Sequence, residues 1–275
     1  MTVFRAGQGR AFRQPFFRLR AALARTWLHP RRLGAWYQER LVAAAFPRER
    51  KVKRLLDIGC GRRPYEPMLR PHVVDYLGVD LPGRFEAERG PDIFADACSL
   101  PFRSGIADVI LCTEVIEHVP DPDLLLREAP RVIAEGGTLI LSAPFFEPLH
   151  EEPYDYTRYT AFGLKAFAER AGFRVREVKR RGGWWAVVLG SLIGQALYDT
   201  VAPRTGTRRR RTPGILLVLP VLVLLQFLAL TLDSFFRGKR VAIGYLLVAE
   251  PKREPLMSEK RSALTPNHGS SNSCQ

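Results

Sequence analysis

The sequence predicts an α/β protein built on a doubly wound, mostly parallel seven-stranded sheet. Short apolar segments that end in a polar residue alternate with helical segments along residues 53–180, and this alternation is typical of a parallel sheet with helices on both faces. The first apolar segment runs into two glycines one residue apart, which favours a sharp strand-to-helix turn. The 275 residues are enough for one such domain and roughly fifty to ninety additional residues.

The first predicted strand and its turn, residues 55–61 with the sequence LLDIGCG, are the segment around which the fold is organised. Asp57 ends the apolar run, and Gly59 and Gly61 lack a Cβ, so the backbone N–H groups of the turn can approach a ligand closely. The helix predicted over residues 64–69 adds the positive end of its dipole. Taken alone, this segment also fits an ordinary strand-to-helix turn, because a lone glycine pair is a weak signal.

Three more predicted strands end in polar side chains. Residues 76–81 contain Asp80, residues 93–97 contain Asp96, and residues 107–112 lead to Thr113. In α/β nucleotide folds, a carboxylate at the end of the second strand accepts hydrogen bonds from the ribose hydroxyls. Asp80 has this position and is the second anchor of the predicted ligand site.

Together these residues resemble the class I S-adenosylmethionine-dependent methyltransferases, in the branch of the ubiquinone- and menaquinone-biosynthesis enzymes with a type 11 methyltransferase domain. The resemblance covers roughly residues 53–180 and a last strand near 241–249. It implies a Rossmann-like methyltransferase fold, an enzyme, and S-adenosyl-L-methionine as the cofactor. The cofactor-binding residues that it implies are Asp57, Gly59 and Gly61 around the methionine part, Asp80 and Leu81 at the ribose, Asp96 and Ala97 at the adenine, and Thr113.

The glycine turn departs from the family pattern at one position. The family often has a third glycine where this chain has Arg63, so the contacts to the cofactor's carboxylate depend on how that arginine is accommodated. A nicotinamide dinucleotide is excluded because its fingerprint needs a glycine where Pro64 stands.

The remaining elements complete the alternation. They are a helix over 123–134, a strand over 138–142, a helix over 161–171 that Thr160 caps, a strand over 172–179 and a last strand over 241–250.

Candidate catalytic residues follow the fourth and fifth strands. Glu114, Glu117 and His118 lie at the ligand-binding edge of the predicted sheet, and His118 either acts as a general base or hydrogen-bonds a loop backbone. The loop over residues 144–160 is expected to cover the site. In this loop His150 or Tyr154 can accept a proton from a substrate hydroxyl, and Arg158 can hold a carboxylate or phosphate.

The loop has a competing interpretation as a packing and helix-capping segment. In the resembled branch, its His-Glu-x-Pro-x-Asp-Tyr-x-Arg-Tyr-Thr pattern often accompanies cell-envelope polysaccharide or lipid genes. We predict no metal, because His150 lacks the second histidine of a zinc-protease helix and the four cysteines lack metal-ligand spacing. The cysteine pattern indicates reduced thiols.

Charge is distributed unevenly along the chain. Residues 1–54 hold 14 basic and 2 acidic residues, residues 55–177 hold 13 and 21, and residues 178–275 hold 15 and 5. The catalytic segment is therefore acidic and its flanks are basic, which indicates an anionic partner surface, either lipid or nucleic acid.

Residues 1–50 are predicted to form a basic helical arm. Phe12, Phe16, Leu19, Leu23 and Trp27 recur at helical spacing in a segment without acids, which is typical of an amphipathic helix on anionic lipid. A helix packed on the core and an organelle transit peptide are the alternatives. Residues 33–46 form a second helical stretch, expected to cover the sheet or the pocket.

An apolar insert over residues 183–237 precedes the last strand. It contains apolar stretches at 184–198 and 214–232, joined by an arginine-rich connection. If the flanking strands share one sheet, a single membrane crossing is excluded, and two crossings would carry five arginines to the far side. We therefore expect a re-entrant or in-plane hairpin bent at Pro220, with two spans or burial in the protein or a homodimer as alternatives. Residues 251–275 have the composition of a disordered tail.

These observations predict a methyltransferase at the cytoplasmic face of a membrane. Its acceptor is a small or lipid-linked molecule, such as a cell-envelope glycan, a lipid or a quinone. A nucleic-acid methyltransferase is the first alternative, but residues 113–115 replace the Asn/Asp-Pro-Pro-Tyr segment of base-amine enzymes. A non-catalytic membrane scaffold that retains the cofactor fold is the second.

Overall fold

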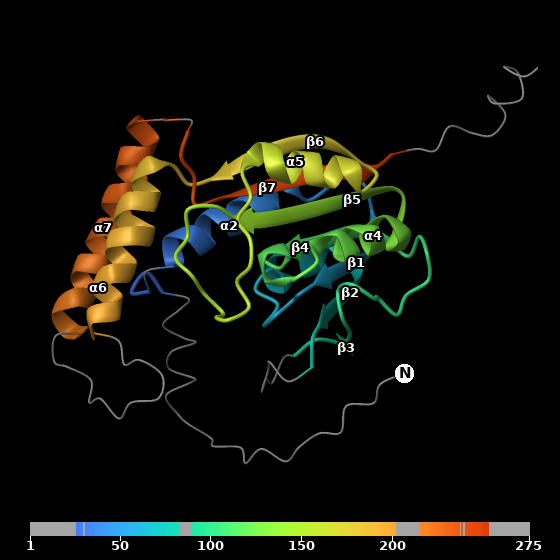
Figure 1. Cartoon of the computed structure of the whole chain (residues 1–275), viewed down its shortest axis with the longest axis horizontal. Helices are drawn as coiled ribbons and strands as arrows, with labels where there is room; N and C mark the ends of the chain where they lie inside the picture. Colours follow the sequence, from blue (N-terminus) through green and yellow to red (C-terminus); the bar gives the residue numbers. More distant parts are fainter. Residues whose placement is uncertain are drawn as a thin grey trace, which may run out of the picture.

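The computed structural model describes residues 26–29, 31–82, 90–201, 215–236, 238 and 240–252. Its centre is a seven-stranded sheet in the order β3-β2-β1-β4-β5-β7-β6, which confirms the predicted doubly wound fold (Figure 1). The strands are β1 (Val52–Ile58), β2 (Val73–Asp80), β3 (Ile93–Phe94), β4 (Ala107–Thr113), β5 (Ile133–Pro144), β6 (Phe173–Arg181) and β7 (Gly244–Pro251). The first five strands pair in parallel, whereas β7 lies antiparallel between β5 and β6.

Helices cover both faces of the sheet, as the alternation of buried side chains along β1 requires. Leu56 and Ile58 face α4 and α5, whereas Leu55 faces α2 and α3. The helices are α2 (Arg32–Ala45), α3 (Glu66–Leu69), α4 (Pro122–Val132) and α5 (Ala161–Arg170), with 3₁₀ turns η1 (Arg70–His72) and η2 (Ile116–His118). The Thr160 hydroxyl accepts a hydrogen bond from Gly163 N at 3.0 Å, so this predicted cap is confirmed.

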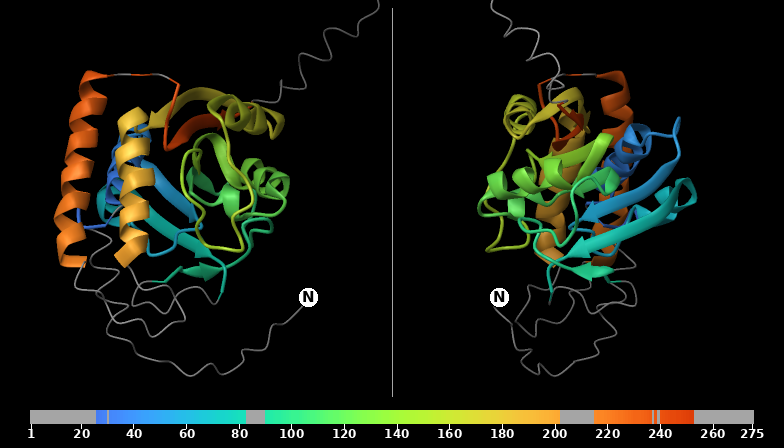
Figure 2. Two further views of the ribbon diagram at one scale, coloured as in Figure 1. Left: turned by 60° about the vertical axis from the view of Figure 1, so that its left-hand side comes forward. Right: turned by 90° about the vertical axis from the view of Figure 1, so that its right-hand side faces the viewer.

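The apolar insert forms a helical hairpin between β6 and β7. A π-helical segment η3 (Ala186–Ile193) continues into α6 (Gly194–Val201), and α7 (Ile215–Phe235) returns beside it (Figures 1 and 2). Its apolar contacts with the domain run through Leu33 of α2 and Ile243 beside β7. Pro220 lies inside α7, which the structure describes as one helix.

Polar side chains on α7 attach the hairpin to the domain. Gln226 accepts a hydrogen bond from Leu33 N at 2.9 Å, and the Asp233 carboxylate accepts hydrogen bonds from the backbone of Gly183 and Trp185, both at 2.9 Å. These contacts satisfy the free N–H groups at the starts of α2 and η3. Within the described residues, Leu217–Phe235 is the one helix long and apolar enough to cross a membrane, with a mean hydropathy of 2.1 and 17% burial.

Several boundaries differ from the sequence predictions. β5 begins at Ile133, before the glycine pair at 136–137, because Ile133 pairs with Ala107 across an irregularity in the ladder. β3 ends at Phe94, and Asp96 lies in a turn beyond it. The predicted arm helix over residues 12–25, the arginine-rich connection at 202–214 and the tail from 253 lie outside the described residues.

Candidate active site

The glycine turn after β1 has the conformation that its glycines allow. Gly59 and Gly61 have positive φ angles of 66° and 54°, which are favourable only for residues without a Cβ. A Cβ on Gly59 would lie 2.2 Å from Val115 Cγ2, so the turn is also closely packed. The N–H groups of Gly59 and Cys60 donate hydrogen bonds to Val79 O at 2.8 and 3.1 Å, which join the turn to β2.

Arg63 stands where the family often has a third glycine, and it adopts the left-handed backbone conformation. Its φ is 52°, and its guanidinium forms an ion pair with Asp92 at 2.7 Å and a longer one with Glu66 at 3.6 Å. These ion pairs offset the backbone strain of Arg63, so the turn retains its backbone conformation without a third glycine.

Asp80 lies at the end of β2 beside the glycine turn, as predicted. Its Oδ2 accepts a hydrogen bond from Gly61 N at 2.8 Å, and its Oδ1 accepts one from Leu81 N at 2.7 Å. Each carboxylate oxygen has two lone pairs, so Asp80, which accepts one of these hydrogen bonds at each oxygen, retains acceptor capacity at the partly exposed edge of the sheet.

The acid of the first strand, Asp57, lies beneath the turn. Its side chain is buried and accepts a hydrogen bond from the Tyr76 hydroxyl at 2.6 Å. Burial raises the pKa of Asp57 to about 7, although the Tyr76 hydrogen bond opposes the shift.

The other predicted cofactor residues follow the neighbouring strands. Asp96 is exposed, and its Oδ1 accepts a hydrogen bond from Cys98 N at 2.8 Å, which fixes the turn that contains Ala97. Thr113 is buried at the end of β4, where it pairs with Ser142 of β5.

The chemistry of this edge fits S-adenosylmethionine. A carboxylate with open acceptor positions suits the ribose hydroxyls, and the glycine turn beside it places no side chain at Gly59 or Gly61. The fitting groups come from the ends of β1, β2 and β3, the edge at which parallel sheets bind ligands.

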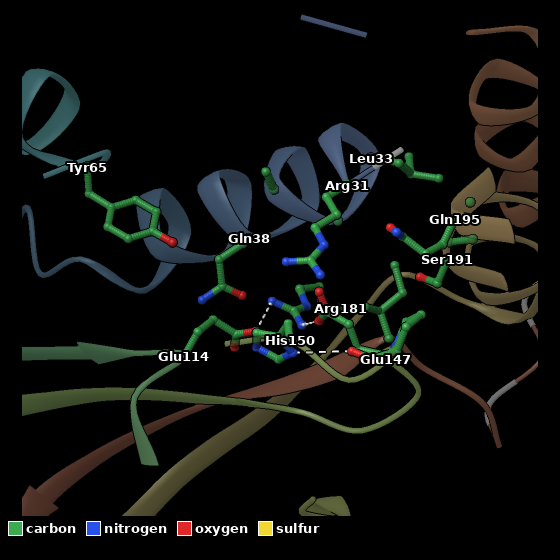
Figure 3. Close-up of a pocket in the computed structure, with 16 residues that line it drawn as sticks. Arg31, Leu33, Gln38, Tyr65, Glu114, Glu147, His150, Arg181, Ser191 and Gln195 are labelled. Atoms are coloured by element: carbon green, nitrogen blue, oxygen red, sulfur yellow. Dashed lines mark hydrogen bonds and ion pairs between the residues drawn. The ribbon is translucent and has the colours of Figure 1, made fainter. Parts of the chain in front are cut away.

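A cavity of about 240 Å³ lies between the ends of β4 and β5 and the helical hairpin (Figure 3). Arg181, only 4% exposed, crosses its wall and forms ion pairs with Glu114 at 2.7 Å and Glu147 at 2.8 Å. These two carboxylates raise the pKa of Arg181 against the opposing effect of its burial. With Arg31, which also lines the cavity, the wall contains two arginines and two glutamates.

Gln38 of α2 connects the cavity to β5. Its Nε2 donates a hydrogen bond to Ser142 Oγ at 2.8 Å, and that hydroxyl donates to Glu114 at 2.8 Å. Among the described residues, Gln38 Oε1 and Arg181 Nε are buried without a hydrogen-bond partner. Two side chains that line the cavity thus each contain one unsatisfied polar atom, an acceptor on Gln38 and a donor on Arg181.

The three predicted proton acceptors lie in different surroundings. His150 lines the cavity. The His118 ring packs edge-on against the His150 ring, with the two centroids 4.8 Å apart. The structure brings these imidazoles together, whereas the Tyr154 side chain is 50% exposed and does not line the cavity. Asp155 holds Arg158 in an ion pair, which lowers the pKa of Asp155 to about 2.

Sequence reasoning missed Arg181, Glu147 and Gln38 as wall residues of the cavity. Arg181 is the last residue of β6, and Glu147 lies three residues after the end of β5. A charged side chain at a strand end is a signal that could have indicated both residues. Gln38 has no such signal, because its role depends on how α2 packs.

Comparison with known proteins agrees with this geometry. Residues 30–178 match a family model described as a methyltransferase domain. An uncharacterized methyltransferase of Mycobacterium sp. (strain KMS) is 36% identical over 180 residues, which cover 58% of this chain and 70% of that protein. A ubiquinone biosynthesis O-methyltransferase of Acinetobacter baumannii (strain AYE) is 27% identical over 47% of this chain and 54% of that protein.

Solved structures share the fold at low identity. A SAM-dependent methyltransferase from Archaeoglobus fulgidus has a TM-score of 0.50 and 18% identity, over 86% of this chain and all of that chain (100%). A Haemonchus contortus phosphoethanolamine N-methyltransferase in complex with S-adenosylhomocysteine has the same TM-score of 0.50 and 18% identity, over 86% of this chain and 60% of that chain.

The fold and the family match define the class of this protein as a transferase that uses S-adenosyl-L-methionine. The chain belongs to the methyltransferase domain family and is a SAM-dependent methyltransferase.

Proposed function

We propose that this enzyme methylates a hydroxyl-bearing, lipid-linked acceptor at the surface of a membrane. The observation that carries the proposal is the cavity between the sheet edge and the hairpin. One wall is formed by Glu114 and Arg181 near the cofactor edge, and the opposite wall by Gly190 and Ser191 of the hairpin. An acceptor in this cavity therefore contacts both the catalytic edge and the apolar insert.

In this proposal the cofactor is held by the predicted residues at the ends of the strands. The turn of Gly59 and Gly61 faces the methionine part and Asp80 accepts hydrogen bonds from the ribose hydroxyls. Asp57, Leu81, Asp96, Ala97 and Thr113 complete the surroundings. The S-adenosylmethionine sulfonium supplies an electrophilic methyl group. The chain's own part is to align the acceptor oxygen, exclude water and take up a proton. His150 lines the cavity and His118 packs against it, so these imidazoles act either as the base or as ligands of an ion that binds the acceptor oxygen.

The polar part of the acceptor follows from the charges of the cavity wall. Arg31 and Arg181 line the cavity together with Glu114 and Glu147, so a free phosphate would face two carboxylates as well as two arginines and would meet little excess positive charge. The open acceptor at Gln38 and the open donor at Arg181 match a hydroxyl, which both donates and accepts. A glycan hydroxyl therefore fits better than an anionic group, and the named O-methyltransferase relative supports oxygen as the acceptor atom.

The lipid part follows from the outer surface of α7. Leu217, Leu224 and Phe235 are 77%, 66% and 76% exposed, and they share one helical face opposite Gln226 and Asp233. The chain is basic on both sides of α7, with Arg208–Arg211 before it and three basic residues over 237–240 after it. We infer that α7 lies in the plane of an anionic cytoplasmic leaflet, as an in-plane hairpin rather than a span.

Transfer of a labelled methyl group tests this function. Purified enzyme is incubated with methyl-labelled S-adenosylmethionine and membranes from cells that produce the protein, and lipid, nucleic-acid and water-soluble fractions are then counted. We expect label in the lipid fraction with wild-type enzyme and none with Asp80→Ala. Label confined to nucleic acid or to water-soluble products would contradict the proposal.

A further inference from the structure

Three potential metal ligands converge beside the cavity. Glu117 and His118 lie in η2 directly after β4, and His150 comes from the loop after β5. Glu117 Oε1 is 3.6 Å from His118 Nε2 and 3.8 Å from His150 Nε2, and the three ligand atoms lie within 4.8 Å of one another. The carboxylate and both imidazoles thus face a common point.

The hydrogen bonds of the opposite ring nitrogens fix the direction of the lone pairs. His118 Nδ1 lies 2.6 Å from Tyr154 O, and His150 Nδ1 lies 3.2 Å from Pro148 O and 3.4 Å from an Asp155 carboxylate oxygen. Carbonyl and carboxylate oxygens accept hydrogen bonds, so each Nδ1 is the protonated nitrogen. Each neutral imidazole then presents a lone pair at Nε2, toward Glu117.

The Glu117 carboxylate favours a cation between it and the two imidazoles. Its side chain is completely buried at 0% exposure, and among the described residues neither carboxylate oxygen receives a hydrogen bond. A buried carboxylate is stable when it is paired or binds a metal. Two imidazole lone pairs and an unpaired carboxylate repel one another unless a metal ion or a proton lies between them.

We propose that Glu117, His118 and His150 bind one divalent transition-metal ion, with Zn²⁺ as the best fit. Two imidazoles and one carboxylate form a known type of zinc site with an open fourth position. Bonds of about 2.0–2.2 Å in a tetrahedron place ligand atoms about 3.3–3.5 Å apart, so the two closest pairs need only a few tenths of an ångström of contraction. Tyr154 O, Pro148 O and Asp155 act as the outer partners that orient the two rings.

The neighbouring glutamate does not belong to the site. Glu114 is occupied by Arg181 at 2.7 Å and by Ser142 at 2.8 Å. The open position instead faces the cavity that His150 lines, where it is available to a water molecule or to an acceptor oxygen. Only the identity of that fourth ligand rests on the proposed function. The ion also fastens the loop after β5 to the end of β4.

Metal binding is measured on the full-length protein. Chelator-treated wild-type enzyme is titrated with Zn²⁺ by calorimetry, and with Co²⁺ by visible absorption, which reports coordination geometry. We expect one equivalent of tightly bound ion. Glu117→Gln and His150→Asn should each weaken binding by more than 100-fold, whereas His72→Asn, a histidine outside the cluster, should leave the affinity unchanged.

Binding of S-adenosylhomocysteine by the same samples separates this inference from the proposed function. A variant that binds this product but no ion is folded, and it supports the site. The proposal is overturned if wild-type protein that binds the product takes up no ion, or if Glu117→Gln and His150→Asn retain wild-type affinity for the ion. Ion binding in a protein that methylates no lipid would leave the site intact and contradict only the proposed function.

Discussion

At the residue scale, the structure explains why the chain needs glycine at position 59. A side chain there would adopt a left-handed φ and place its Cβ 2.2 Å from Val115. We predict that Gly59→Ala lowers the melting temperature by several degrees, because strain and overpacking cost about 2–4 kcal/mol and each 1 kcal/mol shifts the midpoint by about 2–4 °C. Thermal unfolding followed by circular dichroism measures this shift.

Gly105 provides the matched control for that substitution. It has a similar φ of 69°, but a Cβ there would contact nothing within 4 Å. Gly105→Ala should therefore cost only the backbone strain and cause the smaller shift. Equal shifts for the two variants would mean that the packing of the turn against Val115 contributes nothing.

The pKa of Asp57 makes a prediction about pH. Burial raises this pKa from an ordinary value of 3.8 to about 7, so between these values the folded state binds more protons than the unfolded state. The stability that this proton confers is present at low pH and is lost as the pH rises toward 7. Urea unfolding of wild type and Asp57→Asn at pH 5 and pH 7.5 should show a steeper decline with pH in the wild type, by about 2–3 kcal/mol over this interval. A decline that is no steeper in the wild type than in the variant would contradict the assignment.

Sequence patterns located some site residues and not others. Asp80, Gly59 and Gly61 follow predicted strands, so local pattern alone put them at one edge. Glu117, His118 and His150 form a cluster that no spacing rule detects, because the two histidines come from separate segments and meet only through the fold. The interpretation of His150 by local zinc spacing was therefore uninformative.

At the scale of elements, α7 is an apolar helix whose two polar contacts outside the helix come from Gln226 and Asp233, whereas Thr231 and Ser234 are exposed and bond only to the helix's own backbone. Gln226 and Asp233 are seven residues apart, two helical turns; Gln226 caps α2 of the catalytic domain and Asp233 caps η3 of the hairpin. The sequence indicated an apolar hairpin, but we did not infer from it which face of α7 packs on the domain. The seven-residue spacing of Gln226 and Asp233 is the signal that could have identified this face.

The outward face of α7 predicts how the protein binds membranes. Leu217→Asp combined with Leu224→Asp should abolish flotation with vesicles that contain anionic lipid, because both side chains are largely exposed and contribute apolar contact with the bilayer. Phe162→Asp, at an 85% exposed position on α5, is the control and should float like the wild type. If the control variant loses flotation to the same extent, or if the α7 variant still floats, α7 is not the membrane anchor.

At the scale of the whole molecule, the predicted fold class holds because its signals repeat along the chain. β1, β2 and β4 contain short apolar runs that end near Asp57, Asp80 and Thr113, and alternate residues of β1 face two separate helical layers. The places where prediction missed, such as the start of β5 at Ile133, depend on pairing with distant strands. Long-range packing also decides that α2 covers the sheet and supplies Gln38 to the cavity.

The distribution of charge along the chain is also a property of the whole molecule. An acidic catalytic segment lies between basic flanks, so the molecule is polarised along its chain. In the proposed orientation, the basic segments beside α7 meet anionic headgroups while the cofactor edge remains accessible to the solvent. This proposal predicts that membrane attachment and cofactor binding are separable.

The central claim is that S-adenosylmethionine binds at the glycine turn and Asp80, and calorimetric titration tests it most directly. Wild-type protein should bind one equivalent, and Asp80→Ala should weaken binding by about 100-fold or more, because two hydrogen bonds to a charged group are lost. Asp75→Ala, on the same strand with its carboxylate paired to Arg54, should bind like the wild type. Unchanged affinity in folded Asp80→Ala would contradict the account.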